Sequence, residues 1–243
     1  MRAIYTMPAS VGRNLPPPSF MPAGVESAVT ADGLFAVPVP GNLLEAPADL
    51  ARLAAKEHGR SLLWSGWFEA DSDLDALPSP VTWSPRAWSC LDEFCTGAAA
   101  HVLESAAAPN SQVCLLPRAG DLLSDLPSCQ RFLQRRSHWA GASADRFELL
   151  LDPVGMLTME MHPYAAEHVE RIVLGLGAAA GVSGIVLSNI LPGESAAFRQ
   201  PVHRGVIPIQ LLRSLLAEGC DPSLPIMLMN EDVATQLEAL GLS

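Results

Sequence analysis

The sequence has few charged residues and especially few basic ones. Only 17% of its 243 residues are charged, with 15 lysines and arginines against 26 aspartates and glutamates, so the formal net charge is -11. Such a chain has little positive charge with which to neutralise phosphates, so we expect no nucleic-acid partner and no attraction to an acidic membrane surface. The mean hydropathy of +0.23 excludes a disordered or fibrous protein.

The chain also lacks a long hydrophobic run. No basic start is followed by a continuous apolar stretch, and the prolines at 16–18 would interrupt one, so we expect no secretory signal. The uncharged segment Ile172–Leu191 contains four glycines, and we predict a helix, a turn and a buried strand there instead of a membrane span. These features predict a cytoplasmic protein.

Several site signatures are missing. The five cysteines are odd in number and show no CxxC or Cys/His ligand spacing, so we expect buried, reduced thiols. No GxGxxG follows a predicted strand, and the GxxxxGK[ST], GxSxG and HExxH motifs are absent. Nucleotide binding and serine hydrolase chemistry are therefore poorly supported, and we predict no cofactor.

The first part of the chain differs from the rest in composition. Five prolines lie within residues 1–32, and they predict an irregular N-terminal arm there. From residue 33 to residue 243 we expect a single domain, which this length allows. The basic residues Arg131, Arg135 and Arg136 lie on one predicted helix, and we interpret them as a local charged face.

Beyond the arm, short apolar segments alternate with amphipathic ones. Predicted strands cover residues 34–37, 61–64, 112–116, 147–151, 184–187 and 225–229. Predicted helices cover residues 47–58, 84–107, 127–136, 164–180, 209–218 and 231–240. Apolar strands that alternate with helices indicate an α/β fold with a parallel sheet, and both a doubly wound sheet and a (β/α) barrel fit this pattern.

Three segments carry a resemblance to a known superfamily. Phe147–Gly155, His203–Leu212 and Pro225–Met229 resemble the C-terminal half of the xylose isomerase-like TIM barrels, which include sugar-phosphate isomerases and epimerases and the family 2 AP endonucleases. The resemblance covers roughly residues 34–230 and supplies six strands, whereas a full barrel has about eight. It implies a TIM-barrel-like parallel (β/α) barrel that is incomplete or irregular at its N-terminal side.

The resemblance also implies a divalent metal site, but the expected ligands are mostly missing. In that superfamily, carboxylates and imidazoles at the ends of four strands hold the metal. Here the four positions read Pro117 or Arg118, Asp152, Ser188–Asn189 and Met229–Asn230. The histidine expected after Asp152 is replaced around Gly155, and Glu231 comes one residue late. One carboxylate cannot hold a catalytic metal, so we predict a degenerate site without metal.

Five polar residues at predicted strand ends are candidates for contacting a small hydroxylated or anionic ligand: Arg118, Asp152, Asn189, His203 and Arg204. Each guanidinium can receive a phosphate or carboxylate bidentately, or it can form an ordinary surface ion pair. Asp152, which precedes a proline, can instead cap a turn. Trp64 and Trp67 can line a sugar pocket or pack in the core.

Two functions remain open. The preferred hypothesis is a divergent xylose isomerase-like barrel that has lost catalysis and serves as a binding or interaction protein, with a protein partner or a second copy of the chain. The alternative is a sugar or sugar-phosphate isomerase or epimerase-like enzyme with an unusual site at the strand C-termini. A barrel fold alone does not decide between them, so whether the chain is an enzyme stays open.

Overall fold

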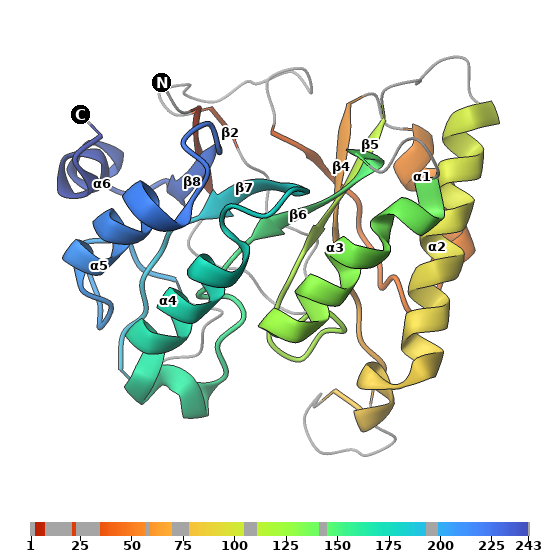
Figure 1. Cartoon of the computed structure of the whole chain (residues 1–243), viewed down its shortest axis with the longest axis horizontal. Coiled ribbons are helices and arrows are strands. Elements are labelled where there is room, and N and C mark those ends of the chain that lie inside the picture. Colours follow the sequence, from red (N-terminus) through yellow and green to blue (C-terminus); the bar gives the residue numbers. More distant parts are fainter. Residues whose placement is uncertain are drawn as a thin grey trace. The chain divides into compact units, whose positions relative to one another are not determined.

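Helices and strands alternate along the chain in the computed structural model (Figure 1). The structure describes residues 3–7, 21–22, 35–56, 59–69, 78–104, 111–140, 145–192 and 199–242. The chain divides into two compact units. Unit 1 consists of Met1–Phe35 and Leu150–Ser243, and unit 2 consists of Ala36–Leu149.

Unit 2 is a parallel sheet with helices between its strands. Its elements are β3 (Val37–Pro38), α1 (Pro47–Lys56), β4 (Arg60–Trp64), the 3-10 helix η2 (Pro80–Trp83), α2 (Pro85–Glu104), β5 (Gln112–Leu116), α3 (Leu126–Ala140) and the first part of β6 (Phe147–Leu151). The strand order is β3-β4-β5-β6, and every pairing is parallel. The last four residues of β4 and of β5 are buried, which is why these strands are almost uniformly apolar.

One charged pair lies within this sheet. Glu148 on β6 accepts a hydrogen bond of 2.9 Å from Nε of Arg60 at the start of β4. Burial raises the pKa of the Glu148 carboxyl, and the nearby Arg60 charge opposes that rise.

Unit 1 contains the remaining elements. They are β1 (Ile4–Met7), β2 (Met21–Pro22), the 3-10 helix η4 (Met159–Tyr164), α4 (Ala165–Leu176), β7 (Val182–Val186), α5 (Ile209–Ser214), the π-helical turn η5 (Leu215–Gly219), β8 (Ile226–Met229) and α6 (Val233–Leu240). Strand β8 pairs in parallel with β1 and β7, and β2 pairs antiparallel with β1. The four residues of β8 are all buried, as a strand with neighbours on both edges requires.

The expected fold class is confirmed. In each unit, parallel strands alternate with helices in an α/β arrangement, as the incomplete, TIM-barrel-like (β/α) barrel expected from the sequence requires. The predicted strands at 112–116 and 147–151 coincide with β5 and β6. The segment Ile172–Leu191 forms the end of α4, a turn and β7, and no helix among the described residues is long and apolar enough to cross a membrane.

The N-terminal segment is more ordered than the sequence suggests. Ile4–Met7, within the expected irregular arm, is a strand whose register places Tyr5 opposite Met227 and Met7 opposite Met229. The proline-rich composition concealed it, because pairing with β8 stabilises a strand only four residues long. Residues 8–20 and 23–34, with the expected boundary after residue 32, lie outside the described part of the chain, so the division into an arm and one domain stays a prediction.

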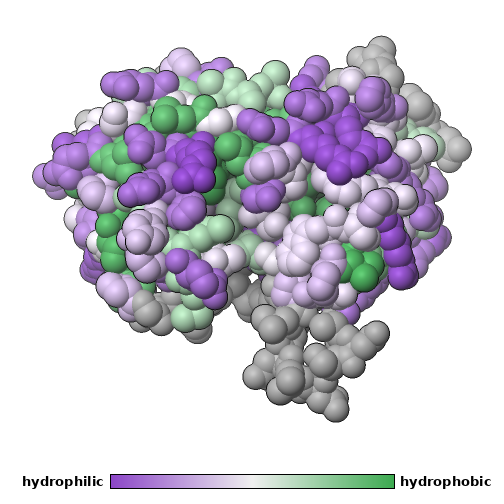
Figure 2. All heavy atoms as spheres, turned by 60° about the horizontal axis from the view of Figure 1, so that its bottom comes forward, coloured by the Kyte–Doolittle hydropathy of each residue, from purple (hydrophilic) through white to green (hydrophobic). Residues whose placement is uncertain are grey.

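The side chains divide between core and surface in the usual way. The largest side chains that are almost fully buried include Trp64, Phe94, Phe132 and Phe147. On the face drawn in Figure 2, hydrophilic side chains cover much of the surface and apolar ones form small separate groups. Surface apolar residues of this kind are normal and do not by themselves mark an interface.

Candidate functional site

In unit 2, a stacked arginine lies at the ends of β4 and β5. Trp64 is the last residue of β4, and Arg118 follows β5 by two residues. The Arg118 Cζ atom is 4.1 Å from the centroid of the Trp64 ring and 5.1 Å from that of Trp67. Both tryptophans are buried, so they provide an apolar wall on which the guanidinium lies.

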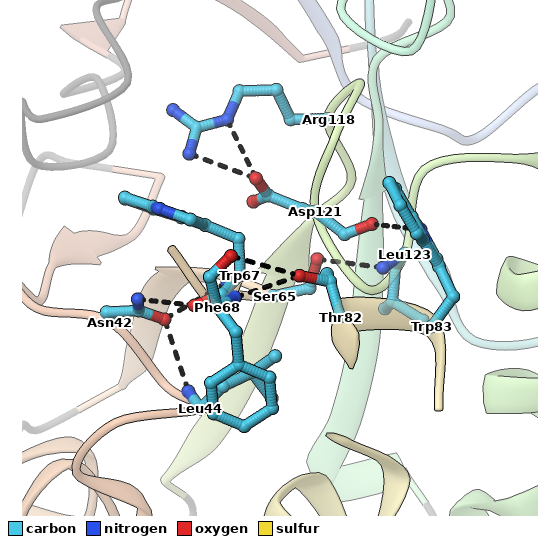
Figure 3. A network of polar contacts seen from close by, with 10 residues as sticks. All are labelled: Asn42, Leu44, Ser65, Trp67, Phe68, Thr82, Trp83, Arg118, Asp121 and Leu123. Atoms are coloured by element: carbon cyan, nitrogen blue, oxygen red, sulfur yellow. Dashed lines mark hydrogen bonds and ion pairs between the residues drawn. The ribbon is translucent and has the colours of Figure 1, made fainter. Parts of the chain in front are cut away.

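The charge of Arg118 is balanced locally by Asp121 (Figure 3). The Nε and Nη2 atoms of Arg118 donate to Oδ1 of Asp121 at 3.3 and 3.1 Å. Asp121 is fully buried at 0% exposure and Arg118 is 8% exposed. The candidate Arg118 is therefore one half of a buried ion pair. The sequence left open a surface ion pair for this arginine, and the structure shows an internal pair instead. The sequence analysis missed Asp121.

Asn42 fixes the loop that carries Trp67 (Figure 3). Its Nδ2 donates to the Trp67 carbonyl at 2.7 Å, and its Oδ1 accepts from the backbone N–H groups of Trp67 and Leu44 at 3.1 and 3.2 Å. Gly66 has φ +82°, and a Cβ there would lie 2.6 Å from the Asn42 Oδ1 atom. Only glycine fits this turn without strain, so the loop is well defined.

The loop after β5 is also tied to η2 (Figure 3). Nε1 of Trp83 donates at 3.1 Å to both the Asp121 carbonyl and the Ser124 hydroxyl. The Ser65 hydroxyl accepts from the Leu123 backbone N–H at 3.1 Å. Trp83 stays 46% exposed although its indole N–H is satisfied. The strand ends of unit 2 are thus held by aromatic packing and backbone contacts.

In unit 1, Asp152 follows β6 and is buried at 1% exposure. Its Oδ1 atom accepts from the Gly155 backbone N–H at 3.0 Å and from Nη1 of Arg199. The contact with Gly155 is the turn cap that the sequence allows as an alternative to ligand binding. A Cβ on Gly155 would lie 2.6 Å from the Asp152 Oδ2 atom, so a glycine is needed for this close approach.

Arg199 is a charged residue of unit 1 that the sequence pattern did not indicate. Its side chain is 2% exposed, and it forms a buried ion pair with Asp152. The two residues are 47 positions apart, and no motif links them. The Arg199 Nε atom and the Ser188 hydroxyl oxygen are buried and have no hydrogen-bond partner among the described residues.

Asn189, which follows β7, is saturated by backbone contacts. Its Nδ2 atom donates to the Val202 and Ile207 carbonyls at 3.1 and 2.9 Å. Its Oδ1 atom accepts from the Ile190 and Ile207 N–H groups at 3.0 and 2.9 Å. The side chain therefore uses both amide hydrogens and two acceptor positions to hold the loop at 199–207 against the end of β7.

His203 and Arg204 lie on that same loop. Arg204 is exposed, and it pairs with Glu231 at 2.6 Å and with Asp232, so the surface ion pair weighed as an alternative is present. His203 has a buried Nδ1 atom with no hydrogen-bond partner among the described residues. Next to His203, the Val202 N–H donates to Oε1 of Gln236. The Nε2 atom of Gln236 in turn donates to the carbonyl of Met229 at the end of β8.

The structure places four candidates in unit 1 and the fifth, Arg118, in unit 2. In unit 1, the loop at 199–207 gathers them: Arg199 reaches Asp152, Asn189 binds the loop backbone, and Arg204 reaches Glu231. Among the described residues, no three His, Cys, Asp or Glu side chains are grouped as a metal site requires. The roles of the five candidate residues in ligand binding stay predictions.

The chain was compared with protein families, curated proteins and solved structures. No family model matches the chain, and no curated protein matches it significantly. Among solved structures, a crystal structure of a D-tagatose 3-epimerase-like protein is similar with a TM-score of 0.38 and 13% sequence identity. The match covers 82% of this chain, which spans 63% of that protein.

Proposed function

We propose that this chain is a non-catalytic binding or interaction protein, built on an incomplete (β/α) barrel without the metal site that the resemblance implies. One observation carries the proposal. Asp152, the carboxylate at the position where the resemblance expects a metal ligand, is paired with the buried guanidinium of Arg199. Its role is that of an internal counter-ion.

This pairing opposes metal binding for an electrostatic reason. A divalent cation at Asp152 would have to lie beside a guanidinium that is 2% exposed and cannot lose its proton. Moving Arg199 aside would leave its charge buried and unpaired, which costs several kcal/mol, roughly 3–5. Asn189, at a second expected ligand position, already uses its amide on backbone groups.

The other parts of the proposal follow from charge and burial. A small hydroxylated or anionic molecule at the strand ends, a protein partner or a second copy of the chain are the proposed ligands, and the net charge of -11 argues against nucleic acid. We place the protein in the cytoplasm because its cysteines suit a reducing compartment. Burial raises the pKa of the Cys95 thiol well above its usual value, which keeps that thiol protonated and unreactive.

Metal binding is the decisive experiment. Purified protein is incubated with Mn²⁺, Mg²⁺ or Zn²⁺, dialysed, and analysed for bound metal and for its thermal unfolding midpoint. We expect less than stoichiometric metal and no shift of the midpoint, because a specific ligand of the folded state would stabilise it. The double variant D152N/R199M is the control for metal held elsewhere.

Stoichiometric metal that depends on Asp152 would overturn the proposal. So would a metal-dependent interconversion of aldose and ketose sugars or their phosphates, which is the chemistry of the alternative enzyme. Each assay uses the full chain, and circular dichroism confirms that the double variant is folded.

A further inference from the structure

A ladder of arginines and tryptophans joins α2 and α3 on the surface of unit 2. Arg131, Arg135 and Trp139 are four residues apart on α3, so they lie along one side of that helix. Trp88 and Asp92 have the same spacing on α2. The two helices are shown in Figure 1, and the contacts below join these two rows of side chains.

Two positive charges share one indole ring in this ladder. The Arg131 Cζ atom is 4.1 Å from the centroid of the Trp88 ring, and the Arg135 Cζ atom is 5.5 Å from it. Cation–π contacts of this length hold the guanidinium groups in place but do not neutralise them. Two arginines held near each other repel, and this repulsion has to be offset by negative charge.

Among the residues that the structure describes, Asp92 is the carboxylate that pairs with this cluster. Asp92 Oδ2 accepts from Arg135 Nη2 at 2.6 Å, and Asp92 Oδ1 accepts from Trp139 Nε1 at 2.8 Å. Both oxygens of Asp92 are therefore engaged. Arg131 is exposed and makes no hydrogen bond or ion pair with any residue that the structure describes. Its guanidinium lies over the Trp88 ring, and the residue is exposed to solvent.

We propose that Arg131 and Arg135 form a binding site for a phosphate monoester, carried by a small molecule or by a phosphorylated protein segment. A guanidinium fork matches the geometry of phosphate oxygens, and two forks one helical turn apart can contact one tetrahedral group. The dianion would offset the unbalanced charge of the pair. A nucleic-acid backbone is a poorer occupant, because the net charge of -11 repels a long polyanion.

The site goes beyond the proposed function. It lies on two helices, not at the strand ends, and it does not depend on whether Asp152 binds metal. The metal experiment and the experiment below therefore succeed or fail independently.

Isothermal titration calorimetry tests the site with inorganic phosphate as the first probe. We expect binding by the full chain, about tenfold weaker binding in R131Q, and an intermediate value in R131K, which keeps the charge but loses the fork. The matched control is R52Q, because Arg52 is exposed on α1 and already paired with Asp49. R52Q should bind like the unmodified protein.

Two further probes distinguish the sources of the phosphate. A hexose monophosphate that binds more tightly than inorganic phosphate, with the loss in R131Q, indicates a small molecule. A phosphoserine peptide that binds more tightly than its unphosphorylated form, with the same loss, indicates a protein segment. The proposal is overturned if the full chain binds none of the three probes, or if R131Q and R52Q bind them equally.

Discussion

The two units neutralise a buried arginine at the ends of their strands in different ways. In unit 1, a buried arginine is neutralised by a carboxylate 47 positions away in the sequence, and a buried amide holds the intervening loop through four hydrogen bonds. In unit 2, Arg118 is neutralised by Asp121 three residues later and lies against two tryptophan rings. Unit 1 relies on long-range ionic contacts, and unit 2 relies on a local turn and aromatic packing.

The difference shows how each unit holds the polar residues at its strand ends. Polar residues at strand ends usually face a ligand, because parallel α/β folds place their sites there. In unit 1, Arg199 pairs with Asp152 and Asn189 binds backbone groups, so these side chains stabilise the fold. In unit 2 the pair Arg118–Asp121 is local, and both residues are buried.

Breaking the ion pair of unit 1 should have the largest effect. We expect R199M to lower the free energy of unfolding by about 3–5 kcal/mol, because it leaves the Asp152 carboxylate buried and unpaired. Urea unfolding followed by circular dichroism measures the loss. The double variant D152N/R199M should recover much of it, and a single-variant loss below about 1 kcal/mol would show that the pair is not buried as described.

Removing the stacked arginine of unit 2 should cost less. We expect R118M to lose about 1–3 kcal/mol, because methionine still packs on Trp64 and Trp67 while Asp121 loses both hydrogen bonds from Arg118. The variant R118K keeps the charge and tests the planar stacking separately. If R118M lowers the free energy of unfolding more than R199M does in the same urea experiment, the ion pair of unit 1 is not the more important of the two.

A pH titration tests the buried carboxyl in the sheet of unit 2. Burial raises the pKa of Glu148 in the folded state, so the folded chain holds this proton more tightly than the unfolded chain does. The stability that this provides is present at low pH and is lost as the pH rises through the folded-state pKa. We expect the E148Q variant to lack this loss. Unfolding midpoints from pH 4 upward, compared between the two proteins, measure it; parallel curves would contradict the burial.

The smallest effect is expected at the surface of unit 1. Arg204 pairs with Glu231 and Asp232, but its side chain is 45% exposed. We expect R204Q to change the free energy of unfolding by no more than about 1 kcal/mol, since solvent and salt screen such pairs. The change should shrink further in 1 M NaCl. A larger, salt-independent loss would mean that Arg204 holds the loop as firmly as Arg199 does.

The fold was largely predictable from periodicity. Apolar runs such as Gln112–Leu116 and Phe147–Leu151 are strands whose residues are almost all buried, and such burial leaves a clear signature in the sequence. Ile4–Met7 left no such signature. It is too short, lies beside prolines, and depends on hydrogen bonds to β8.

The candidate site was predictable only in part. Arg118, Asp152 and Asn189 were found because each follows a buried strand, where chemistry is expected. Their partners Asp121 and Arg199 were missed. Asp121 lies in a turn three residues after Arg118, and Arg199 is brought to Asp152 by a loop whose path has no sequence motif.

By itself, the sequence determined the alternation of parallel strands and helices and the acidic charge. These follow from composition and spacing along the chain. Only the tertiary structure decided what the remaining polar residues do. Asp152 pairs with Arg199, and Arg118 stacks on Trp64, because a buried charge must find its partner in space, and the partner that folding brings near need not be close in sequence.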